Sequence, residues 1–367
     1  MFARNIFFPY NYVFMVDKLT NILILKPSAL GDIVLALPAL TALRRSFPDA
    51  KISWLVRPEF APLLENHPHL DKIITFDRKI LGKAYFNLKA LGTLNSLIKE
   101  LRQSKFDAVF DFQGLFRSAV LAWLSGCKNR FGMANSREMA HLFYTYKIKQ
   151  DADCIHLVDF YLRIVEAAGA KKTDAEFILP SIPKAANAVN KLLESRNIQS
   201  GQYVVLVPGS AHVNKCWPAE RFAQLADKIS SKFNLPIAAI GTNSEKIRVE
   251  EINKLTETKI MNFAGRTSLK ELIELMRSAK LVISNDTGPG HIASALGTPL
   301  VMMYSWSNPA RIAPYGRPEC MVAKDPFTRG MEIKSDNPKH SVINITVDEV
   351  FEKVCEQLKE ANTNKHN

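Results

Sequence analysis

The most informative segment reads NDTGPGHIASALG, residues 285–297, and directly follows the apolar run LVIS at 281–284. An apolar run, a turn of small residues and an alanine-rich segment predict a strand, a tight turn and the start of a helix. Glycines let backbone N–H groups approach a ligand closely, and the positive end of the helix dipole favours a phosphate. The segment therefore predicts a diphosphate-binding turn, although many α/β proteins use such turns only to reverse the chain.

A second turn of this kind lies near the start of the chain, in ILILKPSALGDIVLALPAL at residues 22–40. An apolar strand again runs into small residues, and here the turn also carries Lys26 and Asp32. The chain thus has a strand, turn and helix signal in each half.

Apolar strand candidates alternate with longer amphipathic stretches along the whole chain, which is the pattern of parallel sheets covered by helices on both faces. The predicted strands lie at about 21–26, 51–56, 72–76, 107–112, 203–207, 236–241, 259–263, 280–284 and 299–304. The predicted helices lie at about 32–46, 86–104, 115–125, 156–169, 218–232, 244–256, 268–278 and 289–297. Each half is typical of a doubly wound α/β unit.

The prolines of Pro180-Ser181-Ile182-Pro183 interrupt this alternation, so we place the link between two domains there. The predicted division is an N-terminal extension at 1–20, domains at 21–180 and 184–345, and a C-terminal helix and tail at 346–367. Ligands of doubly wound sheets bind beyond the carboxyl ends of the strands, so two facing units would form a cleft. The stretch 314–339, with four prolines, is expected to be rich in loops.

Composition narrows the class of protein. A formal net charge of +12 calls for an anionic partner, either nucleic acid, an acidic membrane surface or a phosphorylated substrate. The sequence has no zinc finger, RNP motif or dense Lys/Arg tract, which disfavours nucleic acid. Five scattered cysteines without C-x-x-C spacing argue against disulfides and a zinc site and fit a reducing cytoplasm.

The sequence has no apolar run of about 20 residues, so we expect no transmembrane segment. Residues 1–14 hold six aromatic side chains but lack the apolar core and cleavage site of a signal peptide. We expect a weakly ordered extension before a start at Met15, with an interfacial anchor as the alternative.

Further segments point to one family. They are QGLFRSA at 113–119, SRE at 136–138 with LFY at 142–144, HLV at 156–158, and VPGS at 207–210 with KCWP at 215–218. Together with the two glycine turns they resemble the heptosyltransferases of glycosyltransferase family nine, over roughly residues 20–360. The segments around 113–118 and 137–144 are most similar to the heptosyltransferase I branch.

The resemblance implies a GT-B fold, in which two Rossmann-like domains face each other across a cleft. It also implies an inverting glycosyltransferase that moves L-glycero-D-manno-heptose from ADP-heptose to Kdo of the lipopolysaccharide inner core. Its partners would be the nucleotide-sugar donor and a Kdo-lipid A acceptor. Its location would be cytoplasmic and peripheral to the inner membrane.

Asp32 matches the catalytic aspartate of the family, and the resemblance implies that it acts as general base toward the acceptor hydroxyl. From the residues alone, a carboxylate in the first turn of a helix is also common because the helix dipole favours it. That setting lowers the pKa of a carboxylate, whereas a base benefits from a raised pKa.

The predicted donor site combines the loops that follow two strands of the second half. Lys215 would bring positive charge to the phosphates, and hydroxyl and backbone N–H groups would donate hydrogen bonds. Each residue has a plainer alternative, as a surface lysine, a helix-capping threonine, a buried core histidine or a solvated glutamate. The predicted donor-binding residues are Ser210, Lys215, Glu245, Asp286, Thr287, Gly288 and His291.

An acceptor that carries carboxylates and phosphates calls for basic residues in the first half. Two arginines fall inside matching motifs and the other candidates match more loosely. The predicted acceptor-binding residues are Lys26, Arg78, Lys79, Arg117 and Arg137.

Several chemistries are disfavoured by missing motifs. The loop 209–215 lacks the second glycine of a Walker A motif, and the sequence has no G-x-G-x-x-G or H-E-x-x-H pattern. No Asp-x-Asp pair suggests a required metal. We therefore expect a transfer that needs no cofactor and no metal, with Lys215 and backbone dipoles in place of a divalent cation.

Three alternatives stay open. Ala211 and Gly290 depart from the family pattern, which leaves room for heptosyltransferase II or another core-sugar transferase. A nucleotide-sugar epimerase on a GT-B fold would act on the donor alone. A catalytically idle nucleotide-binding protein is disfavoured by the presence of Asp32, Lys215 and Asp286.

Overall fold

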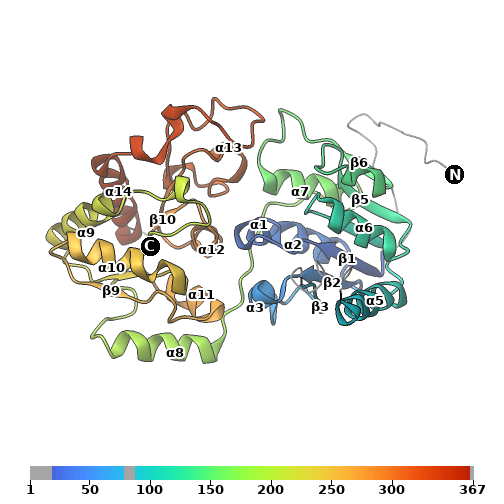
Figure 1. Ribbon diagram of the computed structural model, residues 1–367, viewed down its shortest axis with the longest axis horizontal. Coiled ribbons are helices and arrows are strands. Elements are labelled where there is room, and N and C mark those ends of the chain that lie inside the picture. The colour runs from blue at the N-terminus through green and yellow to red at the C-terminus, as the bar shows by residue number, and fades with distance from the viewer. Residues whose placement is uncertain (1–18, 78–86, 364–367) are drawn as a thin grey trace. The chain divides into compact units, whose positions relative to one another are not determined.

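A computed structural model describes residues 19–77 and 87–363, and Figure 1 shows the elements along the chain. The chain divides into two compact units, Met1–Pro180 and Ser181–Asn367. Both units are α/β, with a six-stranded parallel sheet in each, which confirms the predicted fold class. No helix within the described residues has the length and hydropathy needed to cross a bilayer.

The sheet of the first unit has the strand order β3-β2-β1-β4-β5-β6. Its strands are β1 Asn21–Leu25, β2 Lys51–Val56, β3 Lys72–Thr75, β4 Ala108–Asp111, β5 Asn129–Met133 and β6 Tyr146–Ile148. Its α-helices are α1 Leu30–Leu35, α2 Leu37–Ser46, α3 Ala61–Leu64, α5 Leu88–Gln103, α6 Phe116–Leu124 and α7 Leu157–Glu166, with the 3₁₀ helices η1 Pro58–Phe60 and η2 Ala140–Phe143.

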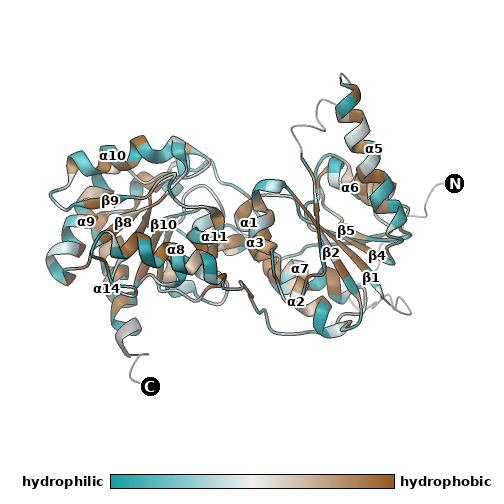
Figure 2. Cartoon of the chain, turned by 90° about the horizontal axis from the view of Figure 1, so that it is seen from below, coloured by the Kyte–Doolittle hydropathy of each residue, from teal (hydrophilic) through white to brown (hydrophobic). Residues whose placement is uncertain are grey.

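Alternating side chains of these strands supply two cores. On one face, Leu23 and Leu25 of β1 join Leu97 of α5 and Leu121 of α6 in a buried cluster. The other face is covered by α2 and α7, which pack against each other. The buried strands are brown in Figure 2, and the teal residues lie mainly on the helices and loops around them.

The second unit repeats the same topology, with the order β12-β11-β10-β7-β8-β9. Its strands are β7 Val204–Val207, β8 Ile237–Ala239, β9 Ile260–Asn262, β10 Leu281–Asn285, β11 Leu300–Met303 and β12 Met321–Val322. Its α-helices are α8 Pro183–Glu194, α9 Ala219–Phe233, α10 Lys246–Leu255, α11 Leu269–Arg277, α12 Gly288–Ala295, α13 Pro309–Ile312 and α14 Val347–Thr363, and its 3₁₀ helices are η3 Val213–Lys215, η4 Asn243–Glu245, η5 Pro318–Cys320, η6 Pro338–His340 and η7 Val342–Asn344.

One face of this sheet is packed with apolar side chains of α9, α10 and α14. Against the sheet also lies α12, which contacts β10, β11 and α11, and α11 in turn packs on α8. Pro183 occupies the first turn of α8, where its missing N–H has no cost.

The strand orders place two pairs of loops together. In the first sheet β1 lies beside β4, and in the second β7 lies beside β10. At these points the chain turns to opposite sides of the sheet, and ligands of doubly wound folds bind there, outside the carboxyl ends of the strands. Both glycine turns singled out in the sequence follow one of these strands.

The helix predicted at 32–46 is in fact two helices, α1 and α2, which meet at Ala36. Pro38 lies in the first turn of α2 and has no N–H to continue the hydrogen bonding of α1. Asp32 lies in the first turn of α1, a few residues beyond the end of β1.

A buried histidine holds the last segment of the first unit in place. His67 Nε2 donates to the carbonyl of Ile178 at 3.1 Å, and His67 Nδ1 accepts from the backbone N–H of His69 at 3.1 Å. Both ring nitrogens are therefore satisfied only when the ring is neutral. Burial, and then the neighbouring His69, lower the pKa of His67 to about 4.

His67 is expected to make the stability of the protein depend on pH below neutrality. As pH falls, the unfolded chain takes up a proton at the ordinary pKa of 6.5, whereas the folded chain takes it up only at about 4. The contribution of His67 to the free energy of unfolding is fully present above pH 6.5. It falls by ~3 kcal/mol as the pH drops from 6.5 to about 4. Urea unfolding at neutral pH and at pH 4 measures this loss.

The variant His67→Gln keeps a donor for the carbonyl of Ile178 but cannot titrate. Its free energy of unfolding should therefore fall by about 3 kcal/mol less than that of the wild type between neutral pH and pH 4. His141→Gln, at a partly exposed histidine of the same unit, controls for removal of an imidazole. Equal acid sensitivity of the wild type and His67→Gln would contradict the assignment.

Candidate functional site

The turn after β1 contains a buried cation beside a half-exposed carboxylate. Lys26 is only 3% exposed, and its Nζ donates to the carbonyl of Phe112 at 3.1 Å, just beyond β4. The same Nζ lies 3.5 Å from Oδ2 of Asp32. Lys26 therefore ties the ends of two neighbouring strands together and orients Asp32.

Asp32 keeps access to solvent, with 40% of its side chain exposed. Its Oδ2 also accepts from the backbone N–H of Ala29 at 3.3 Å, at the start of α1. Lys26 and the N-terminus of α1 both stabilise a negatively charged carboxylate. A fixed, ionised and accessible carboxylate can accept a proton from a bound hydroxyl.

The charge of Lys26 is maintained inside the protein. Burial alone would lower the pKa of Lys26, but attraction to Asp32, Tyr161 and Asp111 outweighs burial and holds that pKa above its ordinary value. Lys26 is therefore a buried, charged residue beside Asp32.

The loop after β4 is shaped by Asp111, which is fully buried. Its Oδ1 accepts from the backbone N–H groups of Gln113 at 2.8 Å and Gly114 at 3.2 Å, and its Oδ2 accepts from the hydroxyl of Tyr144 at 2.7 Å. Burial raises the pKa of Asp111, and burial together with Asp111 raises the pKa of Tyr144. Gln113 Oε1 in turn accepts from the N–H of Ser28 at 3.3 Å, which joins this loop to the turn of β1.

The predicted acceptor residues are distributed unevenly. Arg117 on α6 and Arg137 before η2 are exposed, and the backbone N–H of Arg137 donates to the carbonyl of Gly114 at 3.2 Å. This bond places the 137 segment against the loop that follows β4. Arg78 and Lys79 lie outside the described residues.

In the second unit, Asn285 joins the loops after β7 and β10. Its side chain is buried, its Nδ2 donates to the carbonyl of Pro208 at 2.8 Å, and its Oδ1 accepts from the N–H of Trp217 at 3.0 Å. These bonds fix both ends of the loop that carries Ser210 and Lys215. Sequence reasoning gave Asn285 no role, because its partners are about 70 residues away.

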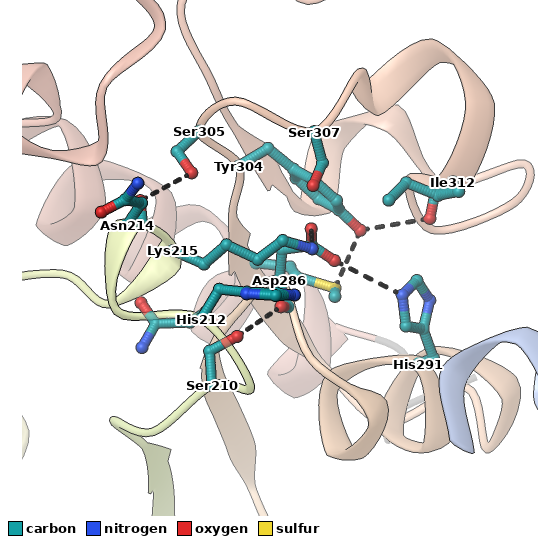
Figure 3. A network of polar contacts seen from close by, with 12 residues as sticks. Ser210, His212, Asn214, Lys215, Asp286, His291, Tyr304, Ser305, Ser307 and Ile312 are labelled. Atoms are coloured by element: carbon teal, nitrogen blue, oxygen red, sulfur yellow. Dashed lines mark hydrogen bonds and ion pairs between the residues drawn. The ribbon is translucent and has the colours of Figure 1, made fainter. Parts of the chain in front are cut away.

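Four predicted donor residues meet at this point (Figure 3). Lys215 Nζ lies 2.5 Å from Asp286 Oδ2, and His291 Nε2 lies 3.7 Å from Asp286 Oδ1. Ser210 Oγ donates to the backbone carbonyl of Asp286 at 3.1 Å. Asp286 thus holds one cationic and one imidazole side chain, each on its own carboxylate oxygen.

This arrangement explains an acidic residue at a proposed anion site. Burial alone would raise the pKa of Asp286, but the interaction with His291 and the charge of Lys215 outweigh it and hold that pKa far below its ordinary value. The carboxylate is therefore ionised and orients its two partners. His291 Nδ1 is buried and has no hydrogen-bond partner among residues 19–77 and 87–363.

The start of α12 supplies further donors. Thr287 is the N-cap residue, but its side chain makes no capping hydrogen bond, so the hydroxyl is not used by the helix. Gly288 begins the helix, where backbone N–H groups lack intrahelical partners. A Cβ on Gly290 would come within 2.9 Å of Met302 Cε and 2.8 Å of Ser284 Oγ. The close packing of α12 on the sheet therefore explains the small residue at this position.

Glu245 lies at the neighbouring strand ends, in η4 after β8. Its Oε2 accepts from the N–H and the hydroxyl of Thr242, at 2.6 and 2.8 Å. The carboxylate passes so close to Gly209 that a Cβ there would lie 1.8 Å from Glu245 Oε1. Glycine at 209 is therefore required for Glu245 to reach across from β8 to β7.

An aromatic side chain that the sequence did not reveal completes the surroundings of Lys215. The Lys215 ammonium lies 5.8 Å from the centre of the Trp306 ring, and Lys334 approaches the same ring at 4.0 Å. His212 contacts Trp306 edge to face, with ring centres 5.5 Å apart. Within the described part of the chain, no three His, Cys, Asp or Glu side chains come together in a way that could hold a metal ion.

The known proteins that this chain resembles in sequence are heptosyltransferases. The family model for glycosyltransferase family 9 (heptosyltransferase) matches residues 94–340. The lipopolysaccharide core heptosyltransferase OpsX of Haemophilus influenzae is 29% identical over 83% of this chain and 84% of its own length. Lipopolysaccharide heptosyltransferase 1 of Escherichia coli K12 is 26% identical over 91% of this chain and 99% of its own length.

Solved structures agree on the fold. A glycosyltransferase family 9 structure from Veillonella parvula has a TM-score of 0.79 at 24% identity, covering 94% of this chain and 98% of that one. The E. coli ADP-heptose heptosyltransferase II structure has a TM-score of 0.75 at 21% identity, covering 94% and 100%. A UDP-GlcNAc 2-epimerase from Neisseria meningitidis has a TM-score of 0.50 at 12% identity, covering 93% of each chain. The heptosyltransferase relatives do not favour the epimerase alternative.

Proposed function

The chain belongs to glycosyltransferase family 9 and is a glycosyltransferase, and from this we propose that it moves L-glycero-D-manno-heptose from ADP-heptose to Kdo of the lipopolysaccharide inner core. The observation that carries the proposal is the cluster of Lys215 and His291 around Asp286 at the start of α12. Such a cluster is suited to a diphosphate leaving group. The relatives named lipopolysaccharide heptosyltransferase 1 support a lipopolysaccharide acceptor, and the resemblance to the heptosyltransferase I branch implies Kdo as the acceptor sugar.

In the proposed mechanism, Asp32 accepts the proton of the acceptor hydroxyl as its oxygen attacks the anomeric carbon. The bond between that carbon and the diphosphate oxygen breaks, ADP leaves with the electron pair, and the configuration inverts. Lys215, Thr287 and the N–H groups at the start of α12 stabilise the negative charge that develops on ADP. Glu245 binds the nucleoside, since its carboxylate can accept hydrogen bonds from ribose hydroxyls.

We place the acceptor on the first unit. The exposed Arg117 and Arg137 bind its carboxylates and phosphates, while the buried Lys26 orients Asp32. Arg78 and Lys79 are proposed for the same anionic acceptor on the basis of sequence. The net charge of +12 supports a protein peripheral to the cytoplasmic face of the inner membrane, where Kdo-lipid A is the partner.

We expect transfer to proceed without a metal or another cofactor, because Lys215 and the N-terminus of α12 supply the positive charge. The rate in EDTA should match the rate in added Mg²⁺ within about twofold. Loss of activity in EDTA that Mg²⁺ restores would contradict this.

Mass spectrometry of the products tests the proposed reaction. The purified protein is incubated with ADP-heptose and Kdo₂-lipid A, beside an acceptor that already carries the first heptose. Addition of one heptose to the Kdo acceptor alone supports the proposal, and transfer only to the heptosylated acceptor would indicate heptosyltransferase II. A changed nucleotide sugar formed without acceptor would indicate an epimerase.

A further inference from the structure

The first unit carries a group of large apolar side chains, most of them exposed, on two segments that contact each other, and we call this group the α6–η2 patch. Its members are Phe116 and Trp123 of α6, 47% and 54% exposed, and Met139, Leu142 and Phe143 around η2, of which the first two are 63% and 58% exposed. The Phe143 ring lies edge to face with Phe116 at 5.5 Å and with Trp123 at 6.3 Å. The two segments therefore form one surface (α6 is labelled in Figure 1).

The pattern of α6 shows why this surface is unusual. Ala119 and Ala122 form the buried side of the helix, whereas Phe116, Val120 and Trp123 follow the spacing of a second apolar face. The outer face of a surface helix is normally polar, and Trp and Phe are costly to leave in water. An exposed apolar group of this kind marks an interaction site.

The backbone before η2 turns Met139 outward. Glu138 and Met139 both have positive φ, 55° and 58°, a conformation that side-chain-bearing residues rarely adopt. The Glu138 carboxylate accepts from the N–H of Phe116 at 3.2 Å, which holds this turn against the start of α6. A strained turn that exposes an apolar side chain points to a functional constraint there.

The charge around the patch identifies the partner. Residues 115–149 contain six Lys and Arg but a single acidic residue, Glu138. Arg117, Lys128 and Arg137 are exposed. Aromatic side chains that insert at the lipid headgroups, together with basic residues that attract acidic headgroups, are typical of proteins that bind an anionic membrane surface. A second copy of the chain would bring two basic surfaces together and is disfavoured.

We propose that the α6–η2 patch inserts into the interfacial layer of an anionic membrane. This inference rests on the proposed function in one respect, namely that the acceptor is a lipid. With the patch inserted, Arg117 and Arg137 would meet that lipid-linked acceptor at the membrane in which it is embedded. The patch itself is an unassigned surface formed by residues other than those proposed for catalysis.

Vesicle binding tests the patch. The probes are vesicles of phosphatidylcholine with and without phosphatidylglycerol, and the variant is Trp123→Ser combined with Met139→Ser. The wild type should bind the anionic vesicles, and the variant should bind at least about tenfold more weakly, because two apolar side chains no longer enter the interface. Ile247→Ser, at a side chain that is 75% exposed on α10, is the matched control and should bind like the wild type.

Activity separates this proposal from the proposed function. Transfer to a water-soluble Kdo acceptor without acyl chains should be the same in the wild type and the variant. If the wild type binds vesicles, the variant does not, and the wild type transfers no heptose, the proposal that the patch binds a membrane stands and the heptosyltransferase assignment is overturned. Equal vesicle binding by both proteins would overturn the membrane role of the patch. So would a wild type that binds no vesicles and is a dimer in light scattering, if the variant is a monomer.

Discussion

Replacing Asp32 by asparagine is expected to lower kcat by about 10³-fold or more while ADP affinity stays within about twofold of the wild type. Asparagine fills the same volume and can still accept from the N–H of Ala29, but it cannot take a proton from the acceptor hydroxyl. Asp32 belongs to the first unit, and the groups proposed to bind ADP belong to the second. The split between kcat and affinity is therefore the expected signature of a base.

Steady-state rates and calorimetric titration with ADP measure the two effects. Asp159→Asn is the matched control, because Asp159 is also an acidic residue in the first turn of a helix of this unit, α7. It should leave kcat near the wild-type value. Retention of more than about a tenth of the activity by Asp32→Asn would rule out Asp32 as the base, since general-base catalysis contributes at least about 10².

Replacing Lys215 by methionine is expected to reduce kcat/KM by about 10²–10³-fold and to weaken ADP binding as well. The ammonium would no longer neutralise the leaving diphosphate. In addition, Asp286, which is 4% exposed, would lose its closest charged partner. Leaving a buried charge without its partner typically costs about 3–5 kcal/mol of stability, so we expect a less stable protein too.

Two further variants separate these effects. Lys215→Met with Asp286→Asn should recover most of the lost stability, because no unpaired charge remains, but neither the affinity for ADP nor the activity. Lys334→Met removes a second ammonium from the Trp306 ring without touching Asp286, and it should change kcat/KM by less than about threefold. If Lys334→Met proved as damaging as Lys215→Met, general positive charge near Trp306 would explain the effect, and the specific role of Lys215 would be wrong.

The sequence predicted the strands whose apolar runs are continuous. β1, β2, β7 and β10 begin and end within one or two residues of the predicted bounds, because these buried strands are rich in Ile, Leu and Val. β5 was missed, since its sequence NRFGM has neither a run nor an alternation of apolar residues. Its Gly132 is needed because a Cβ there would lie 2.4 Å from the Tyr144 ring, and that contact is invisible before the sheet is assembled.

The candidate site was predictable in its turns but not in its pairings. The small residues and the polar side chains after β1 and β10 marked both loops. The roles of Asp111 and Asn285 depend on partners that are distant in sequence, Tyr144 for Asp111 and Pro208 for Asn285, and only the folded sheet brings these partners close. For the same reason the burial of Lys26 could not be foreseen, because a lysine directly after a strand is equally compatible with the surface.

The common strand order of the two sheets bears on how such an enzyme changes its substrates over evolution. Each unit brings its loops together at the same two strands, the first and the fourth of its own sheet. Mutations in the loops after β1 and β4 change how the first unit recognises its substrate. They do not disturb the bonds that Asn285 and Asp286 make in the second unit. With the acceptor on the first unit and the donor on the second, as proposed, selection can diversify the acceptor of a lineage while its sugar donor is inherited unchanged.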